Sequence, residues 1–175
     1  MVITYQVGHT EGHSLKGSLC DFCCRMTPSI EAIHAFENYS RKGACFAAAL
    51  DGDTVVGSSL NVPASQNAKL AEMPELITWL DGNGHSLSKI VYPAMIYVDP
   101  DYSGLGIGDK ISVMKSQHSI EDGYTHTILF GYETQAIFDY STRIGSLIDT
   151  GCDDWGGFRI YLRRLEDVVS ALTKA

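Results

Sequence analysis

The sequence predicts one α+β (mixed α/β) domain over residues 1–175, built around a single central sheet. Apolar residues make up 45% of the chain, which is enough for a core that needs no disulfide. Segments with strand-like and helix-like spacing of apolar residues alternate along the chain. Hairpin signals lie towards both ends, so we expect antiparallel pairing as well as strand–helix alternation.

The first part of the chain predicts three strands and two helices. Residues 2–7 have the composition of a short strand. Apolar residues recur at helical spacing over 15–26, and a second helix is expected over 29–36. Residues 45–60 form two apolar runs on either side of Gly52. Because glycine tolerates the positive φ of a tight turn, this segment predicts a hairpin.

A helical insertion is expected at about 64–87, broken near Pro74. It could cover an acceptor site as a lid, or pack on the sheet as a fixed helix. Residues 89–99 read as a long strand that contains Pro93. Since proline donates no ladder hydrogen bond, we expect an edge segment or a bulge there.

The remaining segments alternate between helix and strand. We expect a helix near 107–121, a buried strand at 125–132, a helix at 134–145, closing strands near 146–150 and 157–163, and a C-terminal helix at about 164–173.

Charge and composition exclude several classes of partner. Lys and Arg number 13 against 21 Asp and Glu, a net charge of −8, whereas a nucleic-acid-binding protein would show a basic face. Neither a signal peptide nor a run of about 20 apolar residues is present, so no membrane partner is expected. Five cysteines without a regular framework indicate reduced thiols and a cytoplasmic location.

The most informative segment is Ile96–Gly108, which runs from an apolar strand through a glycine-rich turn into a helix. Alternating glycines allow close approach of a ligand, and free N–H groups at a helix start favour a diphosphate. A P-loop needs Gly-Lys-Ser/Thr, but Asp109 follows Gly108. A dinucleotide fold would place the turn after the first strand, not beyond the middle of the chain. A turn that binds no ligand remains the alternative.

This segment resembles motif A of the GNAT superfamily of N-acetyltransferases, Q/R-x-x-G-x-G/A. Ser103 stands at the Gln/Arg position, and Gly106 and Gly108 match the glycines. Residues 134–145 resemble the family's second motif, N-x-x-A-I-x-L-Y-x-x-x-G, with Glu133 at the Asn position. The resemblance implies a mostly antiparallel, twisted sheet of six to seven strands, flanked by helices and splayed between the fourth and fifth strands. It also implies acetyl-CoA as cofactor, released as CoA.

The resemblance assigns roles to particular residues. Tyr140 matches the tyrosine that protonates the departing thiolate, and Glu133 is placed to act as general base through a water. Asp99, His85 and Glu72 are weaker candidates for the base. The residues assigned to the cofactor are Ile96, Tyr97, Val98, Ser103, Gly104, Leu105, Gly106, Ile107, Gly108 and Asp109.

A metal site is not expected from the sequence. Cys20, Cys23 and Cys24 lie close together, with His9 and His13 upstream, but no second C-x-x-C or H-x-x-x-H pair follows. Helical spacing instead places Cys23 on an apolar face, where buried thiols are common. Arg41-Lys42 is expected to be a solvated pair, with the 3′-phosphate of the cofactor as its alternative partner.

The predicted function is an N-acetyltransferase that moves an acetyl group from acetyl-CoA directly to a primary amine of a small molecule or peptide. The alternative is a non-catalytic GNAT-like module that binds CoA or a protein. The identity of the amine cannot be read from these residues. The family resemblance also suggests a homodimer.

Overall fold

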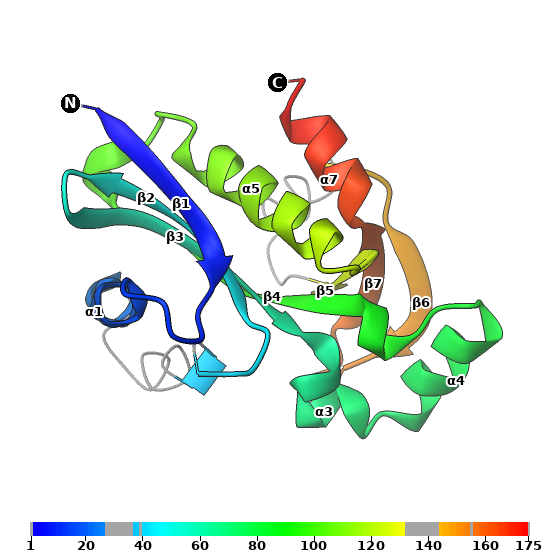
Figure 1. Ribbon diagram of the computed structural model, residues 1–175. Coiled ribbons are helices and arrows are strands. Elements are labelled where there is room, and N and C mark those ends of the chain that lie inside the picture. The colour runs from blue at the N-terminus through cyan, green and yellow to red at the C-terminus, as the bar shows by residue number, and fades with distance from the viewer. Residues whose placement is uncertain (1, 27–36, 39, 132–143, 155, 175) are drawn as a thin grey trace. The chain divides into compact units, whose positions relative to one another are not determined.

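The computed structural model describes residues 2–26, 37–38, 40–131, 144–154 and 156–174 (Figure 1). One seven-stranded sheet has the order β1-β2-β3-β4-β5-β7-β6. β4 and β5 pair in parallel, and the other recorded pairings are antiparallel. The predicted fold class, a mixed α/β chain with a mostly antiparallel sheet flanked by helices, is confirmed. No described helix is long and apolar enough to cross a membrane.

The chain forms two compact units. The first contains Met1–Val62 and Pro93–His118, and the second contains Pro63–Tyr92 and Ser119–Ala175. The expectation of a single domain over 1–175 stays a prediction.

The first unit contains the three N-terminal strands, the second half of β4 and most of α5. Gly52 has a φ of +59° between Asp51 and Thr54, which face each other in the β2–β3 pairing, so the predicted hairpin is confirmed. The predicted helix at 29–36 lies outside the described residues. The elements that lie wholly or largely in this unit are β1 (Ile3–His9), α1 (Lys16–Met26), β2 (Cys45–Asp51), β3 (Thr54–Pro63), β4 (Ile90–Val98), η3 (Pro100–Tyr102) and α5 (Ile107–Glu121).

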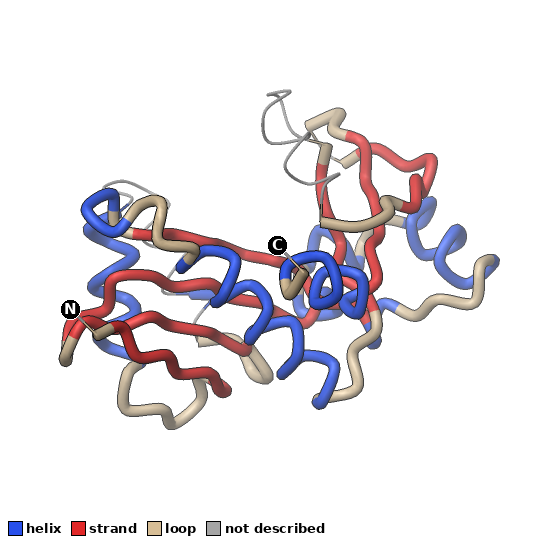
Figure 2. Tube along the Cα trace, turned by 90° about the horizontal axis from the view of Figure 1, so that it is seen from above, coloured by secondary structure: helices blue, strands red, loops and turns tan. Residues whose placement is uncertain are grey.

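Two helices cover opposite faces of this part of the sheet (Figures 1 and 2). Successive side chains of a strand point to opposite faces, so Phe46 and Ala48 join the α1 core while Ala47 and Ala49 join the α5 core. β2 is therefore buried on both faces, which explains its continuous apolar run. On the α5 face, Ile107 and Ile111 are almost completely buried.

The second unit contains the insertion and the closing strands. As expected, the insertion is broken at Pro74, which begins α4. Leu70, Leu76 and Leu80 are buried in one core with apolar residues of β5 and β7, so these contacts favour a fixed element over a lid. The elements of this unit are η1 (Ala64–Gln66), α3 (Ala68–Ala71), α4 (Pro74–Gly82), η2 (Leu87–Lys89), β5 (His126–Phe130), β6 (Ile148–Asp153), β7 (Arg159–Arg164) and α7 (Leu165–Leu172).

Of the two expectations for Pro93, the edge segment was wrong, because β4 lies inside the sheet, and the bulge stays a prediction. The pairing of β4 with β5 covers only Ile90 with His126 and Val91 with Thr127. It therefore stops before Pro93, where a proline would interrupt the ladder. This short parallel pairing agrees with the splay expected between the fourth and fifth strands.

The start of α5 approaches β3 very closely at Gly57. A Cβ atom at Gly57 would lie 2.8 Å from Cγ2 of Ile107 and 3.6 Å from the carbonyl oxygen of Tyr97. Real Cβ atoms do not approach other heavy atoms this closely, so only glycine fits without displacement. The missing side chain at Gly57 therefore sets the position of the first turn of α5.

Lys115 is a buried cation on α5. Its side chain is 6% exposed, and burial lowers its pKa from 10.5 to about 8, partly offset by Cys45. A charged ammonium in this place opposes folding, because its hydration is lost.

We expect the stability of the protein to rise with pH above about 8 because of Lys115. Between the folded pKa and the unfolded value of 10.5, the unfolded chain binds more protons, so higher pH favours the folded state. Below pH 8 the lysine is protonated in both states, so the free-energy cost of burying its charge is constant, at roughly 3 kcal/mol for such a shift of the pKa. Lys115→Met should therefore raise the free energy of unfolding at neutral pH by up to about 3 kcal/mol. Urea denaturation as a function of pH measures both effects, and parallel profiles for wild type and variant would contradict the prediction.

Gly57→Ala should destabilise the protein by about 1–3 kcal/mol, because the new methyl group overlaps Ile107. The matched control is Gly17→Ala in α1, where a Cβ meets no atom within 4 Å. Since alanine favours helix over glycine, the control should be neutral or stabilising. Chemical denaturation measures both, and equal stabilities of the two variants would show that the approach at Gly57 is not tight.

Candidate functional site

The candidate site is the turn that joins β4 to α5 within the first unit. Gly104 and Gly106 have φ values of +75° and +69°, a region that residues with a side chain rarely adopt. A Cβ at either position would meet no atom within 4 Å, so glycine is required here by the backbone and not by crowding. Residues 103–106 are exposed. The turn therefore presents the backbone of its two glycines to solvent, beside the side chains of Ser103 and Leu105.

Hydrogen bonds fix the start of this turn. The backbone amide of Asp99 donates to the carbonyl of Val56 at 2.9 Å, and the Asp99 carboxylate accepts from the amide of Asp101 at 3.1 Å. The Tyr102 hydroxyl donates to the carboxylate of Asp51 at 2.9 Å, and this bond is the main reason that the pKa of Tyr102 is raised. The turn is thus attached to the β2–β3 hairpin.

The turn leads directly into the N-terminus of the 15-residue helix α5. The first amides of a helix have no acceptor within the helix, and the helix dipole adds partial positive charge there. Such an end binds phosphate groups well. Asp109 contributes a carboxylate to this first turn, and Ser103 offers only a short hydroxyl. Recognition of an anion would therefore depend on the backbone.

Two exposed apolar side chains lie next to the turn. Among the described residues, the large apolar side chains that are exposed are Val2, Ile96 and Leu105. Ile96 is 46% and Leu105 51% exposed, and both belong to the segment that the sequence assigned to the cofactor. Neighbouring Met95 and Tyr97 instead pack against the α1 core. Ile96 and Leu105 thus offer apolar contact area to a ligand at the turn.

The two predicted catalytic residues, Tyr140 and Glu133, lie outside the described residues, as does most of the second motif. The weaker base candidates have other contacts or lie elsewhere. Asp99 caps the turn, and His85 stacks on Trp79 with ring centroids 5.8 Å apart. Glu72 follows α3 on the surface of the second unit.

Two of the three cysteines of α1 are core residues, and Cys24 is exposed. Cys20 and Cys23 are buried, and burial is the main reason that the pKa of Cys20 is raised. The upstream His13 packs edge-on against Phe46 and accepts a hydrogen bond from the amide of Leu15. Arg41 bonds to Asn38 at 3.1 Å. Cys20, Cys23 and His13, which were weighed as metal ligands in the sequence, therefore have packing contacts in the first unit.

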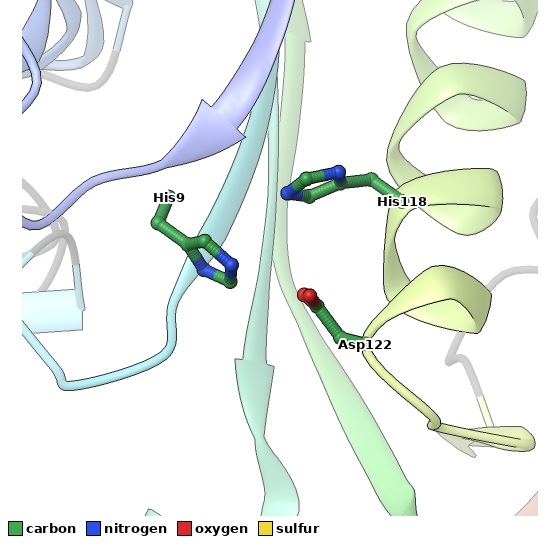
Figure 3. Close-up of side chains that lie close together, drawn as sticks. All are labelled: His9, His118 and Asp122. Carbon is green, nitrogen blue, oxygen red and sulfur yellow. The ribbon is translucent and has the colours of Figure 1, made fainter.

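The structure instead brings His9 next to His118, a residue that the sequence reasoning missed. Their ring centroids lie 5.0 Å apart, and Asp122 follows one helical turn after His118 (Figure 3). In the sequence, the only indication of this cluster is a histidine and an aspartate four residues apart at the end of a predicted helix, a spacing that places two side chains on one helix face. The contact of His118 with His9 of β1 could not be predicted from the sequence, because it depends on how the strand and the helix pack.

A cavity of about 330 Å³ lies in the second unit, at the start of β5. None of the predicted cofactor residues lines it. Burial is the main reason that the pKa of His126, which faces this cavity, is lowered. The lining residues are Ile120, Gly123, Tyr124, Thr125, His126, Arg164 and Glu166.

Comparisons with known proteins find relatives by structure and not by sequence. No family model matches the chain, and no curated protein matches it in sequence. A GNAT-family acetyltransferase from Staphylococcus aureus Mu50 is 17% identical, with a TM-score of 0.57 over 94% of this chain and 99% of the other. The PaiA N-acetyltransferase from Thermoplasma acidophilum, solved with coenzyme A, is 14% identical, with a TM-score of 0.54 over the same shares.

A third solved structure is the CoA-dependent acyl-homoserine lactone synthase BjaI, with SAM and isopentyl-CoA. It is 13% identical, with a TM-score of 0.68 over 99% of this chain and 89% of the other. The strand order, the parallel β4–β5 pair and these likenesses together show that the chain has the fold of the GNAT acetyltransferases.

Proposed function

We propose that this protein is an acyl-CoA-dependent N-acyltransferase that moves an acetyl group from acetyl-CoA to a primary amine. The observation that carries the proposal is the exposed turn at 103–106, which joins the parallel strand β4 to the start of α5. Two positive-φ glycines hold its backbone in a shape that leaves room for a ligand. Two of the neighbours by structure were solved with coenzyme A or an acyl-CoA.

In this proposal the turn binds the diphosphate of the cofactor. The amides of Gly106, Ile107 and Gly108 donate to phosphate oxygens, since a helix start provides amides without internal acceptors. Ile96 and Leu105 contribute their exposed apolar surface to other parts of the cofactor. Other residues of the same segment are also proposed to contact the cofactor. They are Tyr97, Val98, Ser103, Gly104 and Asp109.

The chemical step is direct transfer. The amine nitrogen attacks the thioester carbonyl, the new C–N bond forms and the C–S bond breaks. Glu133 accepts the proton of the amine through a water, and Tyr140 protonates the departing thiolate of CoA. The acceptor is a small molecule or a peptide with a free amine, and the net charge of −8 favours the approach of a cationic amine.

A second candidate function is a binding module that holds CoA without transferring the acetyl group. The features that favour it are Asp109, whose carboxylate lies in the first turn of α5, and the short Ser103. A carboxylate near a diphosphate repels it electrostatically. Consumption of acetyl-CoA in the presence of a panel of amines separates the two candidates, because only the enzyme consumes the thioester.

We expect acetyl-CoA or CoA to stabilise the protein by about 2.7 kcal/mol at a hundredfold excess over the dissociation constant. Gly106→Val should remove this stabilisation, because a branched side chain at a φ of +69° displaces the backbone and blocks access of phosphate. Thermal unfolding with and without CoA measures the effect.

The matched control for this variant is Gly12→Val in the same unit. Gly12 has a φ of +71°, and a Cβ there also meets no atom within 4 Å, so the backbone strain is comparable. The control should lose stability but keep its response to CoA. If Gly106→Val responds to CoA as the control does, the cofactor binds elsewhere.

Tyr140→Phe should lower turnover by roughly 10²-fold and leave the affinity for CoA nearly unchanged, because only the proton donor is lost. Glu133→Gln should alter the ascending limb of the pH–rate profile, since that limb reports the base. Steady-state kinetics over a range of pH measure both variants. Full activity of Tyr140→Phe would assign the tyrosine to packing, and an unchanged profile for Glu133→Gln would move the base to another group.

A further inference from the structure

We propose that the cavity at the start of β5 binds a small zwitterion of the α-amino-acid type, with Arg164 and Lys89 at its carboxylate and Glu166 at its ammonium. The cavity and every residue that the proposal uses belong to the second unit. None of these residues belongs to the cofactor turn, so the proposal does not depend on the proposed acetyl transfer.

The size of the cavity limits its ligand. Proteins bind small molecules in cavities of about 300–1,000 Å³, and the volume here, about 330 Å³, lies at the lower end of that range. Ile120 contributes apolar surface to the lining, while most of the other lining residues carry polar or charged side chains. A molecule with charged groups and few other atoms therefore fits this cavity best.

The first cation of the cavity is Arg164. It ends β7 directly opposite His126, the first residue of the antiparallel neighbour β5 (Figure 1). Opposite residues point to the same face of a sheet, and both line the cavity. Among the described residues, the guanidinium of Arg164 makes no hydrogen bond or ion pair. It is therefore available to bind a carboxylate through two parallel N–H···O bonds.

A second cation lies beside the cavity. A Cβ atom at Gly123, which lines the cavity, would lie 3.5 Å from Nζ of Lys89. The backbone of Lys89 is held in place, because its carbonyl accepts hydrogen bonds from the amide and the hydroxyl of Thr125 at 2.9 and 3.3 Å. Its ammonium has no partner within the part of the chain that the structure describes. Two cations without acidic partners favour an anionic group in the ligand.

The cavity also carries an acid. Glu166 lies in the first turn of α7, and the amide of Leu165 attaches the start of this helix to the carbonyl of Thr125 at 3.0 Å. Glu166 lines the cavity, yet it forms no ion pair with another described residue. Its carboxylate would repel a simple anion but would pair with an ammonium. A ligand that carries both charges therefore matches the cavity better than an anion does.

His126 adds a hydrogen-bond acceptor to the wall of the cavity. Its Nδ1 lies 2.8 Å from the hydroxyl of Thr125, which donates its only proton to the carbonyl of Lys89, so Nδ1 carries the ring proton. Burial, with smaller effects of His85 and Arg164, lowers the pKa of His126, so the ring is neutral at pH 7. Nε2 is then a buried acceptor without a partner in the described residues, which favours a ligand that donates hydrogen bonds, as an ammonium does.

The test is calorimetric titration of the whole protein, without CoA, with each of the common α-amino acids in turn. We expect at least one of them to bind at a single site per chain. The matched probes are the carboxylic acid that lacks its amino group and the amine that lacks its carboxylate. Each should bind at least about tenfold more weakly, because each has lost one charge-assisted contact. Inorganic phosphate should not displace the amino acid.

Substitutions locate the bound amino acid. Arg164→Gln and Glu166→Gln should each lower the affinity by at least about tenfold, and Lys89→Gln by a smaller factor. The control for the cations is Lys174→Gln, which removes an exposed positive charge of the same unit outside the cavity lining. The control for the acid is Glu75→Gln, which removes an exposed carboxylate from the first turn of α4, as Glu166→Gln does from α7. Both controls should bind as the wild type does.

Three results would overturn the proposal. The first is that no amino acid binds, and the second is that phosphate or the acid without an amino group binds as tightly. The third is full affinity in both Arg164→Gln and Glu166→Gln, which would place the amino acid at another site, such as that of the acceptor in the proposed acetyl transfer. All the substituted side chains are exposed, so each variant should fold, and thermal unfolding without ligand checks this.

Discussion

The close approach of α5 to β3 at Gly57 is the constraint on which the candidate site depends. Because Gly57 has no side chain, Ile107 reaches the sheet and becomes buried in the first turn of the helix. The preceding turn must then bridge from the end of β4 to a fixed helix start. It does so with two positive-φ glycines, and the Tyr102–Asp51 hydrogen bond attaches it to the hairpin. Packing in the core thus determines the shape of an exposed loop.

The same helix carries a buried cation that opposes folding, and two buried polar side chains. Lys115 is buried on α5 with a lowered pKa, and Ser116 and Ser119 are buried on the same helix. An apolar side chain at position 115 would pack with less cost. The N-terminal end of α5 follows the turn that we propose as the cofactor site, and its last turn carries His118, whose ring lies beside that of His9.

Local patterns in the sequence were sufficient to predict most of the described helices and strands. Gly52 between two apolar runs predicted the hairpin, and α5 was expected near 107–121, where it is found. Pro93 was expected at an edge segment or a bulge, and the edge alternative was wrong because β4 lies inside the sheet and its pairing with β5 ends just before Pro93. Contacts between distant segments could not be predicted. Nothing local indicates that Gly57 meets Ile107, that Tyr102 bonds to Asp51 or that His9 meets His118.

The central claim is that the backbone of the turn at 103–108 binds the diphosphate of CoA. Amide hydrogen exchange, followed by residue in the free protein and with saturating CoA, tests it most directly. The claim predicts that exchange slows chiefly at the amides of Gly104 to Asp109, because they donate to phosphate oxygens. Slowing confined to the residues around the cavity at His126 would contradict the claim, and so would unchanged exchange in the turn with CoA bound.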